Sequence, residues 1–302
     1  MRAPMRRFLF FLFRWMKRLA GGRYGRGFGS APAVGPLFQR AFAILKPRGV
    51  VLTKYRGMPL YADADDPAHA PLFLGAEYND PEIDAAQKRL KPGMTAVDIG
   101  ANIGCFALAM ARAVGPSGRV YAFEPMPKNL ETLRKNCALN KAAHVVIEGK
   151  AVGDRSGTAL LSVEEETGVA EPIARQKKAH GEHQTAEAEM VALDGYFGDS
   201  PPRVDFVKMD IQGFEAAALR GMKRLLEANP QMEMIVELDP ERLTACGEDP
   251  MRFLQELTGH GFSLFHVSHA RKARERLRPV SPEEALSACA EEGRHINLYC
   301  AR

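Results

Sequence analysis

Short apolar runs alternate with helical stretches from about residue 82 to the C-terminus. Such alternation is typical of an α/β fold built on a mostly parallel sheet. The expected strands are 95–99, 120–123, 145–148, 204–209, 233–238, 262–267 and 296–300, and the expected helices are 81–90, 104–113, 127–140, 215–228 and 251–261. The fold class predicted is therefore α/β, with a doubly wound, mostly parallel, seven-stranded sheet of the Rossmann-like kind.

The pattern changes between the third and fourth of these strands. Residues 158–163 predict one extra strand, whereas residues 164–189 are polar and show no apolar period. We expect a long loop or lid there, since long loops in compact domains are often functional. Over the whole chain we expect an N-terminal arm with a Gly-rich linker at 1–30, a lead-in segment at 31–72 and the main domain at 73–302.

The arm combines aromatic and basic residues. Its uninterrupted apolar run, 8–13, is too short to span a bilayer, which takes roughly 20 residues. It is also shorter than the core of a signal peptide, which takes about 7 or more. Wound as a helix, 6–19 would gather its Lys and Arg within a sector of roughly 120°, with most aromatic side chains opposite. An interfacial helix of residues 5–20 on an anionic membrane and a helix packed on protein both fit this pattern.

Composition and charge narrow the function classes. Apolar residues make up 46% and charged residues 26% of the 302 residues, which excludes wholesale disorder and a multispanning membrane protein. Residues 1–62 hold thirteen Lys or Arg and no Asp or Glu, while the remainder has a net charge of −9. No nucleic-acid reader motif accompanies the basic arm, so no nucleic acid is expected. Five scattered cysteines suit a reducing compartment. We expect a cytoplasmic protein, with attachment to the inner face of the membrane as a further hypothesis.

The strongest chemical signal is the segment 97–104, VDIGANIG. A strand ends in Asp98, a turn containing Gly100 and Gly104 follows, and a helix begins. Glycines there let the backbone approach a ligand, and the turn is expected to present free N–H groups at the helix start. A dinucleotide site is disfavoured, because the third glycine is missing and Asp98 would repel a diphosphate. A ligand with an ammonium and a sulfonium group suits the turn better.

Glu124 follows the second strand, twenty-six residues after Asp98. A carboxylate in this position can accept hydrogen bonds from both hydroxyls of a ribose. NAD would need the same carboxylate, so Glu124 alone does not separate the two cofactors. Together with Asp98, Gly100 and Gly104, it favours S-adenosyl-L-methionine.

With these motifs the sequence resembles the FkbM family of S-adenosylmethionine-dependent methyltransferases. The resemblance covers roughly residues 73–300 and rests on an ordered set of segments: 98–104, 120–125, 151–154, 205–215, Glu237 and 297–299. It implies a class I methyltransferase fold and methyl transfer to an oxygen, commonly on a sugar or a polyketide-like product. Some members have Glu where this chain has Gln212, so no carboxylate role is carried over to that position.

The resemblance also implies roles for individual residues. Asp98 and the turn with Gly100, Asn102 and Gly104 would hold the methionine end of the cofactor. The other implied cofactor residues are Glu124 and the adjacent Pro125 at the ribose, and Ala151 and Val152 at the adenine.

The segment 208–215, KMDIQGFE, lies where the fourth strand meets its helix. Lys208 and Asp210 are two residues apart and therefore share a face of the strand. We expect Asp210 to act as the base or to orient the acceptor, with Glu215 and Glu237 as weaker candidates and Lys208 holding a carboxylate in place. The alternative is an ion pair that only orders the turn. No metal site is predicted, since two carboxylates in a sequence do not establish one.

These observations predict O-methylation of a small-molecule, sugar or glycolipid acceptor. An N-methyltransferase on the same fold is one alternative, because the acceptor pocket decides the atom. A non-catalytic cofactor-binding module on a membrane is another, and an NAD-dependent oxidoreductase is disfavoured by the glycine spacing. The sequence leaves the oligomeric state open.

Overall fold

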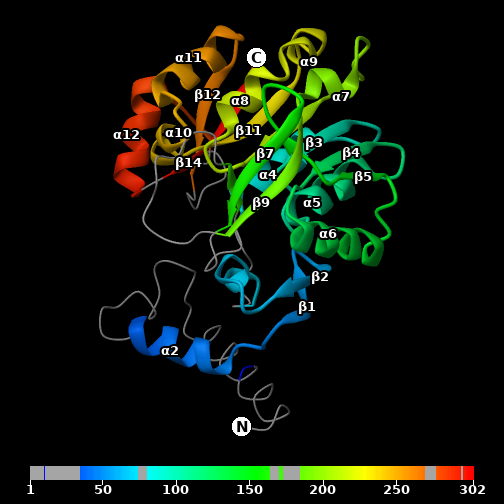
Figure 1. The fold of residues 1–302 in the computed structure, drawn as a ribbon, viewed down its shortest axis with the longest axis vertical. Helices are drawn as coiled ribbons and strands as arrows, with labels where there is room; N and C mark the ends of the chain where they lie inside the picture. The colour runs from blue at the N-terminus through cyan, green and yellow to red at the C-terminus, as the bar shows by residue number, and fades with distance from the viewer. Residues whose placement is uncertain are drawn as a thin grey trace. The chain divides into compact units, whose positions relative to one another are not determined.

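The computed structural model describes residues 10, 35–73, 80–163, 170–172, 184–268, 277–293 and 295–302 (Figure 1). The expected interfacial helix at 5–20 lies outside this part of the chain except for Phe10, and so does the Gly-rich linker. The chain divides into two compact units, which are described separately below. The first contains residues 1–79 and 166–168, and the second contains 80–165 and 169–302.

The first unit is built on a helix and a β-hairpin. Its elements are α2 (Gly35–Leu45), β1 (Val50–Tyr55), β2 (Met58–Asp63), a 3₁₀ turn (Pro67–His69) and α3 (Ala70–Phe73). Arg56 and Gly57 connect the two strands, and both have a positive φ, of 49° and 82°. Two consecutive positive φ angles are typical of the turn that matches the twist of a two-stranded ribbon.

The second unit contains one large sheet of eight strands in the order β13-β12-β14-β11-β10-β3-β4-β5. The strands are β3 (Thr95–Ile99), β4 (Arg119–Phe123), β5 (Val145–Glu148), β10 (Phe206–Met209), β11 (Glu233–Leu238), β12 (Ser263–Val267), β13 (Leu277–Pro279) and β14 (Ile296–Ala301). The five strands from β5 to β11 pair in parallel, and β14 is antiparallel to both of its neighbours. The predicted fold class is confirmed. The eighth strand, β13, is an exposed three-residue edge that the sequence analysis missed.

Helices cover this sheet, and their starts follow ordinary capping rules. They are α4 (Pro81–Arg89), α5 (Cys105–Val114), α6 (Pro127–Leu139), α7 (Leu193–Phe197), α8 (Glu215–Arg220), α9 (Lys223–Ala228), α10 (Pro240–Ala245), α11 (Pro250–Gly259) and α12 (Pro282–Glu292). Five begin with proline after a cap residue, and Ser281 forms a capping box with Glu284. The helix predicted at 215–228 is two helices, because the chain turns at Gly221, against the backbone of Gly153.

A second sheet replaces much of the predicted loop at 164–189. It contains β6 (Ala151–Val152), β7 (Gly157–Val163), β8 (Ala170–Pro172) and β9 (Gln184–Val191), and β7 pairs antiparallel with β9 (Figure 1). The expectation of an uninterrupted loop was wrong for 170–172 and 184–189. In β9 the buried positions Ala188 and Met190 alternate with the exposed Glu187 and Glu189. Small alanines between glutamates carry little apolar signal, so the period of two was hidden.

The order of strands in the large sheet fixes where a ligand site belongs. The chain runs from β3 outward to β4 and β5, and then returns to place β10 on the other side of β3. Ligands of open α/β sheets bind outside the carboxyl ends of the strands at such a switch point. The ends of β3 and β10 are therefore the place to look for the site.

Candidate functional site

Two turns meet at this switch point. Gly100 follows β3 with a φ of +81°, and a Cβ added there would overlap the carbonyl oxygen of Asp210, which follows β10. The backbone N–H of Asp210 also donates to the carbonyl of Ile99 at 3.1 Å. Gly100 is thus required by the contact between the two turns, whether or not a ligand also approaches its backbone. Gly104 likewise has no room for a side chain, since its Cβ would lie 2.6 Å from Leu133.

The two turns have matching backbone conformations. Asp98 and Lys208 are partners in the β3–β10 register, and Asn102 and Gln212 each stand four residues further on. Both Asn102 and Gln212 have a positive φ, of 49° and 59°. Residues other than glycine adopt this region at a cost of order 1–3 kcal/mol, and such positions cluster at functional sites.

The N–H groups of the first turn are already used inside the protein. Those of Gly100 and Ala101 donate to the carbonyl of Phe123, at 3.0 and 2.9 Å. The N–H groups of residues 102, 103 and 104 donate to the side chains of Glu124 and Asn102 and to the carbonyl of residue 101. The expectation of free N–H groups was therefore wrong for residues 100–104. A diphosphate would find no donor among them, which argues against a dinucleotide.

Asp98 is a fully buried carboxylate with few donors beside it. Its side chain is 0% exposed, and neither oxygen accepts a well-formed hydrogen bond within the described residues. The backbone N–H of Ala107 and the Nζ of Lys208, 3.5 Å away, are the donors that act on it, and burial raises the pKa of Asp98 despite them. Asp98 thus places a carboxylate directly behind the first turn, paired with the charge of Lys208.

Glu124 ties the first turn to the end of β4. One carboxylate oxygen accepts from the N–H of Asn102 at 2.8 Å, and the other accepts from the N–H of Met126 at 2.9 Å and from the amide of Asn129 at 3.4 Å. Burial raises the pKa of Glu124, and these hydrogen bonds oppose the rise. A carboxylate has about four acceptor positions, so one remains for a hydroxyl of a bound ribose.

The expected adenine wall lies beside this carboxylate. Ala151 and Val152 form β6 and are buried, and Pro125 is half-buried. Ala151 belongs to an apolar cluster of the second sheet, against which Met126 and Phe214 pack. These two side chains follow the strands that end near Glu124 and Asp210. The second sheet therefore borders both ends of the candidate site.

Lys208 connects the two turns. Its Nζ donates to the carbonyl of Gly100 at 2.9 Å and lies 3.5 Å from Asp98 and 3.6 Å from Asp210. Burial alone would lower the pKa of Lys208, but the charges of Asp210, Asp98 and Glu237 raise it instead. Lys208 is therefore a permanently charged group between two carboxylates, as expected for a residue that holds them in place.

Asp210 and Glu237 form a carboxyl pair joined by Gln212. The amide of Gln212 donates to both, at 2.9 Å to Asp210 and 3.1 Å to Glu237. The pKa of Asp210 is lowered, because Lys208 and Gln212 outweigh its burial. The pKa of Glu237 is raised well above its usual value by burial and by Asp210. One negative charge thus resides on Asp210, whose side chain is 39% exposed and therefore accessible.

Glu215 lies beside this pair but serves its own turn. Its two oxygens accept from the N–H groups of Ile211 and Gly213, at 2.8 and 2.9 Å. Burial raises the pKa of Glu215 to about 7, against these two hydrogen bonds. The carboxylate orders the turn at the start of α8, and its side chain is almost fully buried.

Glu82 and His295, at this edge, escaped the sequence analysis, whereas Asn297 belongs to a segment of the family resemblance. Asn297 is directly opposite Glu237 in the β11–β14 register, and its amide donates to Glu82 at 2.9 Å. Burial, followed by Asp80, raises the pKa of Glu82 to about 8. His295 lies 3.8 Å from Glu237. No sequence signal distinguishes Glu82 from the other charges of its helix, since only the fold brings α4 to β14.

The ammonium of Lys208 is paired with carboxyl groups at this edge. Asp98 and Asp210 lie 3.5 and 3.6 Å from its Nζ, and the charge of Glu237 also acts on it. Burial raises the pKa of Glu82, Glu215 and Glu237, which reduces the negative charge that these three groups carry. Among the described residues, no group of three or more His, Cys, Asp or Glu side chains is arranged to hold a metal ion. Likewise, none of the helices within the described ranges is long and apolar enough to cross a membrane.

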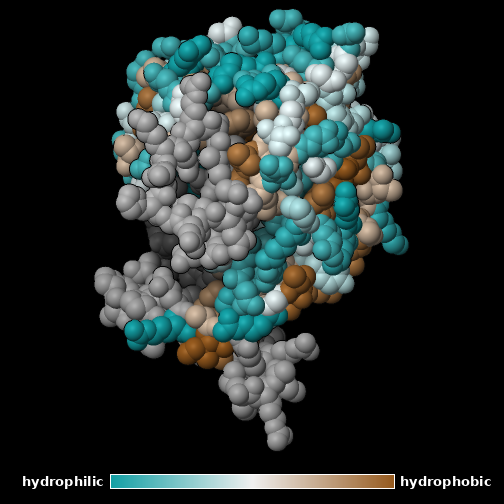
Figure 2. Space-filling view, viewed as in Figure 1, coloured by the Kyte–Doolittle hydropathy of each residue, from teal (hydrophilic) through white to brown (hydrophobic). Residues whose placement is uncertain are grey.

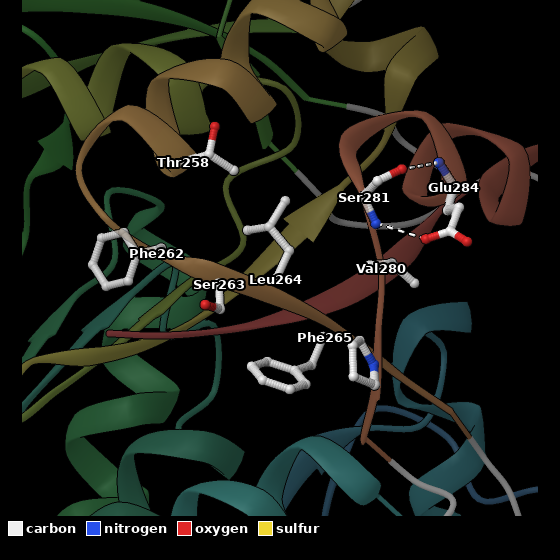
Figure 3. Close-up of a pocket in the computed structure, with 9 residues that line it drawn as sticks. Thr258, Phe262, Ser263, Leu264, Phe265, Val280, Ser281 and Glu284 are labelled. Atoms are coloured by element: carbon white, nitrogen blue, oxygen red, sulfur yellow. Dashed lines mark hydrogen bonds between the residues drawn. The ribbon is translucent and has the colours of Figure 1, made fainter.

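A surface cavity of about 450 Å³ lies elsewhere, at the outer strands β12 and β13 and the start of α12 (Figure 3). Its walls carry Thr258, Phe262 and Leu264 on one side and Val280 and Ser281 on the other. Ser281 is engaged with Glu284 in the capping box (Figure 3). The cavity lacks the convergent carboxylates of the switch point, so we do not assign the chemistry to it.

Comparison with known sequences matches the chain to a family. The sequence model described as "Methyltransferase FkbM domain" matches residues 98–264, from Asp98 to the strand β12. The match includes both turns, Glu124 and Glu237. It also includes the strands of the second sheet.

Two curated relatives are methyltransferases. "Methyltransferase sdnD" of Sordaria araneosa is 29% identical over 154 residues, which is 42% of this chain and 59% of that protein. A "Protein-L-isoaspartate O-methyltransferase" of Methanothrix thermoacetophila is 43% identical over 47 residues, which is 16% of this chain and 22% of that protein. This chain thus spans less than two thirds of the length of either relative.

Solved structures that the chain matches include an Aeropyrum pernix fibrillarin in complex with S-adenosyl-L-methionine. It is 14% identical, with a TM-score of 0.40, and the alignment covers 84% of this chain and 83% of that one. A "SAM-dependent O-methyltransferase" from Thermotoga maritima is 16% identical, with a TM-score of 0.39 and coverage of 89% and 81%.

Proposed function

The chain belongs to the FkbM family of methyltransferases, and from this premise we propose that it transfers a methyl group from S-adenosyl-L-methionine to a hydroxyl oxygen of a small-molecule, sugar or glycolipid acceptor. Methyltransferase activity and the cofactor follow from the family. The choice of oxygen, the acceptor and the residue roles are our proposal. The observation that carries it is the accessible carboxylate of Asp210 at the switch point, 39% exposed, 3.6 Å from the Nζ of Lys208 and bonded to the amide of Gln212.

The cofactor would be held by the first turn and the end of β4. Asp98, with Gly100, Asn102 and Gly104, would take the methionine end, and Glu124, Pro125, Ala151 and Val152 would take the ribose and adenine. Bound S-adenosylmethionine supplies an electrophilic methyl group on a positively charged sulfur. The buried carboxylate of Asp98 behind the first turn supports this assignment, because its charge attracts the ammonium group of a bound ligand.

Asp210 is proposed to accept the proton that leaves the acceptor hydroxyl. It is ionised while Glu237 is neutral, so the pair has room for one proton. Gln212 keeps the two carboxyls together, and Lys208 fixes Asp210 beside the first turn. Glu215 acts indirectly, by ordering the turn that carries Asp210. Positioning supplies most of the rate in this scheme, and the base adds about 10²–10⁴-fold.

An amine acceptor is the second candidate, because the surplus of carboxylates at this edge also suits a cationic substrate. A neutral amine nucleophile would likewise give up a proton to Asp210. A glycolipid is included among the acceptors because the segment 5–20 is basic and aromatic; apart from Phe10, this segment lies outside the described residues. A cytoplasmic site of action, with that segment on the membrane, is part of the same proposal.

The test has a binding arm and a turnover arm. We expect S-adenosylhomocysteine, but not NAD, to bind the purified chain in isothermal titration calorimetry. With hydroxyl and amine acceptors, formation of S-adenosylhomocysteine should fall by about 10²–10⁴-fold in Asp210→Asn while cofactor affinity persists. Asp199→Asn, at a side chain 97% exposed, is the matched control and should turn over normally. Binding without turnover on every acceptor would favour a non-catalytic module, and NAD binding would refute the cofactor site.

A further inference from the structure

Helix α4 carries a buried glutamate that takes no part in the scheme above. Charged side chains ordinarily lie at the surface, as in the hydrophilic cover over α9 and α11 in Figure 2. Glu82, in contrast, is 7% exposed. Glu82, Ala86 and Arg89 are four and three residues apart, so they share one face of α4. A buried carboxyl group on a helix face needs partners that make its burial tolerable.

The two ends of this helix face contact opposite edges of the large sheet. Glu82, near the start of α4, accepts a hydrogen bond at 2.9 Å from the amide of Asn297. Asn297 is directly opposite Glu237, the last residue but one of β11. Arg89, at the end of α4, forms an ion pair at 2.9 Å with Glu233, the first residue of β11. Glu82 therefore anchors the end of α4 that lies at the carboxyl edge of β11.

Asn297 connects Glu82 with the side of the site that holds the proposed base. Opposite residues of paired strands share a face of the sheet, so the side chains of Asn297 and Glu237 are neighbours. Gln212 donates to Glu237 at 3.1 Å and to Asp210 at 2.9 Å. Polar side chains thus form one row from Asp210 to Glu82. The residue that anchors the start of α4 is the last member of this row.

Asp80, the residue before α4, connects Glu82 with the first turn (residues 100–104). The two carboxyl groups are joined by a hydrogen bond, which follows burial among the causes that raise the pKa of Glu82 to about 8. Burial, followed by the charge of Asp80, raises the pKa of Cys105 to about 12. Cys105 begins α5 directly after the first turn, so Asp80 lies close to that turn. Gln87 of α4 also donates to the carbonyl of Ala109 in α5, at 3.3 Å. The start of α4 is thereby held beside the first turn.

Both contacts require a neutral carboxyl group on Glu82. A protonated carboxyl accepts from Asn297 and can donate its proton to Asp80, whereas an ionised one would repel Asp80. The charge of Lys208 is already paired with Asp98 and Asp210, at 3.5 and 3.6 Å. Within the described residues, the titratable side chains that α4 and its neighbouring elements carry at this edge are Asp80, Asp84, Cys105, Lys208, Asp210, Glu237, His295 and Tyr299. Ionisation of Glu82 would therefore open its contact with Asp80.

We propose that Glu82 is a positioning residue of the methyl-transfer site. It is joined through Asn297 to the row that ends at Asp210, and through Asp80 to the first turn, so it fixes the start of α4 across both sides of the site. Glu82 acts through these neighbours and contacts neither cofactor nor acceptor. The inference rests on the proposed cofactor site at the switch point. Release of the start of α4 at alkaline pH should weaken cofactor binding.

The test compares wild type with Glu82→Gln by calorimetry with S-adenosylhomocysteine, using the full chain at pH 7 and pH 9. If only protein with a neutral Glu82 binds, a pKa of about 8 leaves about one tenth of the wild type competent at pH 9. Its dissociation constant should then be up to about tenfold larger at pH 9 than at pH 7. The variant cannot ionise at this position and can still accept from Asn297 and donate to Asp80, so this loss should be absent. The amino group of the ligand titrates in both experiments, and its effect cancels in the comparison.

Arg89→Gln is the matched control, because it breaks the contact of the same helix face at the other edge of the sheet. It should keep the affinity and the pH dependence of the wild type. Glu82→Leu removes both contacts and should weaken binding severalfold already at pH 7. Circular dichroism at both pH values checks that each protein is folded. The comparison of wild type with Glu82→Gln does not depend on the folding of Glu82→Leu.

The outcomes separate positioning from a merely structural role. Equal pH dependence of binding in wild type and Glu82→Gln would overturn the inference. A loss in Arg89→Gln as large as in Glu82→Leu would also overturn it, because any loosening of α4 would then suffice. Wild type that fails to bind S-adenosylhomocysteine at pH 7 would refute the cofactor site of the proposed function, and this inference with it. Turnover by Asp210→Asn tests the proposed base separately, so that proposal can fail while this inference stands.

Discussion

Replacing Glu82 by Gln should stabilise the protein at alkaline pH. Burial and Asp80 raise the pKa of Glu82 from 4.5 to about 8. Between these two values the folded chain keeps a proton that the unfolded chain has lost, so stability falls as pH rises through this window. Each pH unit corresponds to about 1.36 kcal/mol for one group. Over the full window, protonated Glu82 contributes at most about 4–5 kcal/mol to the free energy of unfolding, and roughly 3 kcal/mol of this contribution is lost by pH 7.

Gln cannot ionise, and its oxygen can still accept the hydrogen bond from Asn297. Urea unfolding at pH 5, 7 and 9 should therefore give similar stabilities for wild type and Glu82→Gln at pH 5, and a growing advantage for the variant above it. The comparison of the two proteins cancels the titration of the other buried carboxyls. Glu131→Gln is the control, because the side chain of Glu131 is 70% exposed and Lys135 lowers the pKa of its carboxyl. A Glu82→Gln advantage that does not grow with pH would refute the buried, protonated state of Glu82.

Two further predictions concern the cofactor site. Glu124→Gln should weaken S-adenosylhomocysteine binding by about 1.5–3 kcal/mol in calorimetry, because a charged acceptor of the ribose hydroxyl is lost; unchanged affinity would remove Glu124 from the ribose site. Gly100→Ala should lower the free energy of unfolding by about 1–2 kcal/mol, because alanine disfavours the positive φ of this position. Overlap of its Cβ with Asp210 should lower it by about 1–3 kcal/mol more and should also weaken cofactor binding. Gly261→Ala is the control, because Gly261 has a φ of +87° but open space around it, so urea unfolding should show only the loss that comes from the positive φ. Equal losses in the two variants would contradict the contact between the turns.

Seven of the eight strands of the large sheet could be predicted from the sequence because each has a local signal, which the three-residue β13 lacks. The run 95–99 is short, apolar and followed by a glycine turn, and β10 and β11 are likewise short apolar runs. In the second sheet β7 had such a signal, but β9 did not, since it presents alanine where a strand ordinarily presents Val or Ile. Its stability comes from partners distant in sequence, as Ala188 faces Ala159 and Met190 packs near Gly153. Pairing of this kind is invisible to any local pattern.

The same distinction explains which site residues were found. Asp98 is the last residue but one of β3, and Glu124 and Asp210 directly follow β4 and β10, so their positions at the carboxyl edge follow from the fold class alone. Gln212 and Glu82, in contrast, take part in the site through the hydrogen bonds that their side chains form. Gln212 has a positive φ and joins Asp210 to Glu237 by two hydrogen bonds, and Glu82 accepts a hydrogen bond from Asn297 across 215 residues of sequence. Neither the conformation nor the contact is encoded by residue type and spacing.

The first turn shows how a motif can indicate the right ligand for an incomplete reason. Glycine turns at helix starts suggest anion binding, because they ordinarily offer free N–H groups. Here Phe123 and Glu124 accept from the N–H groups of Gly100, Ala101 and Asn102, and the group buried behind the turn is the carboxylate of Asp98. The turn therefore has an acceptor where a phosphate site has donors. We propose that this reversal favours a ligand with its own cationic donors, and the glycines allow the packing of the two turns.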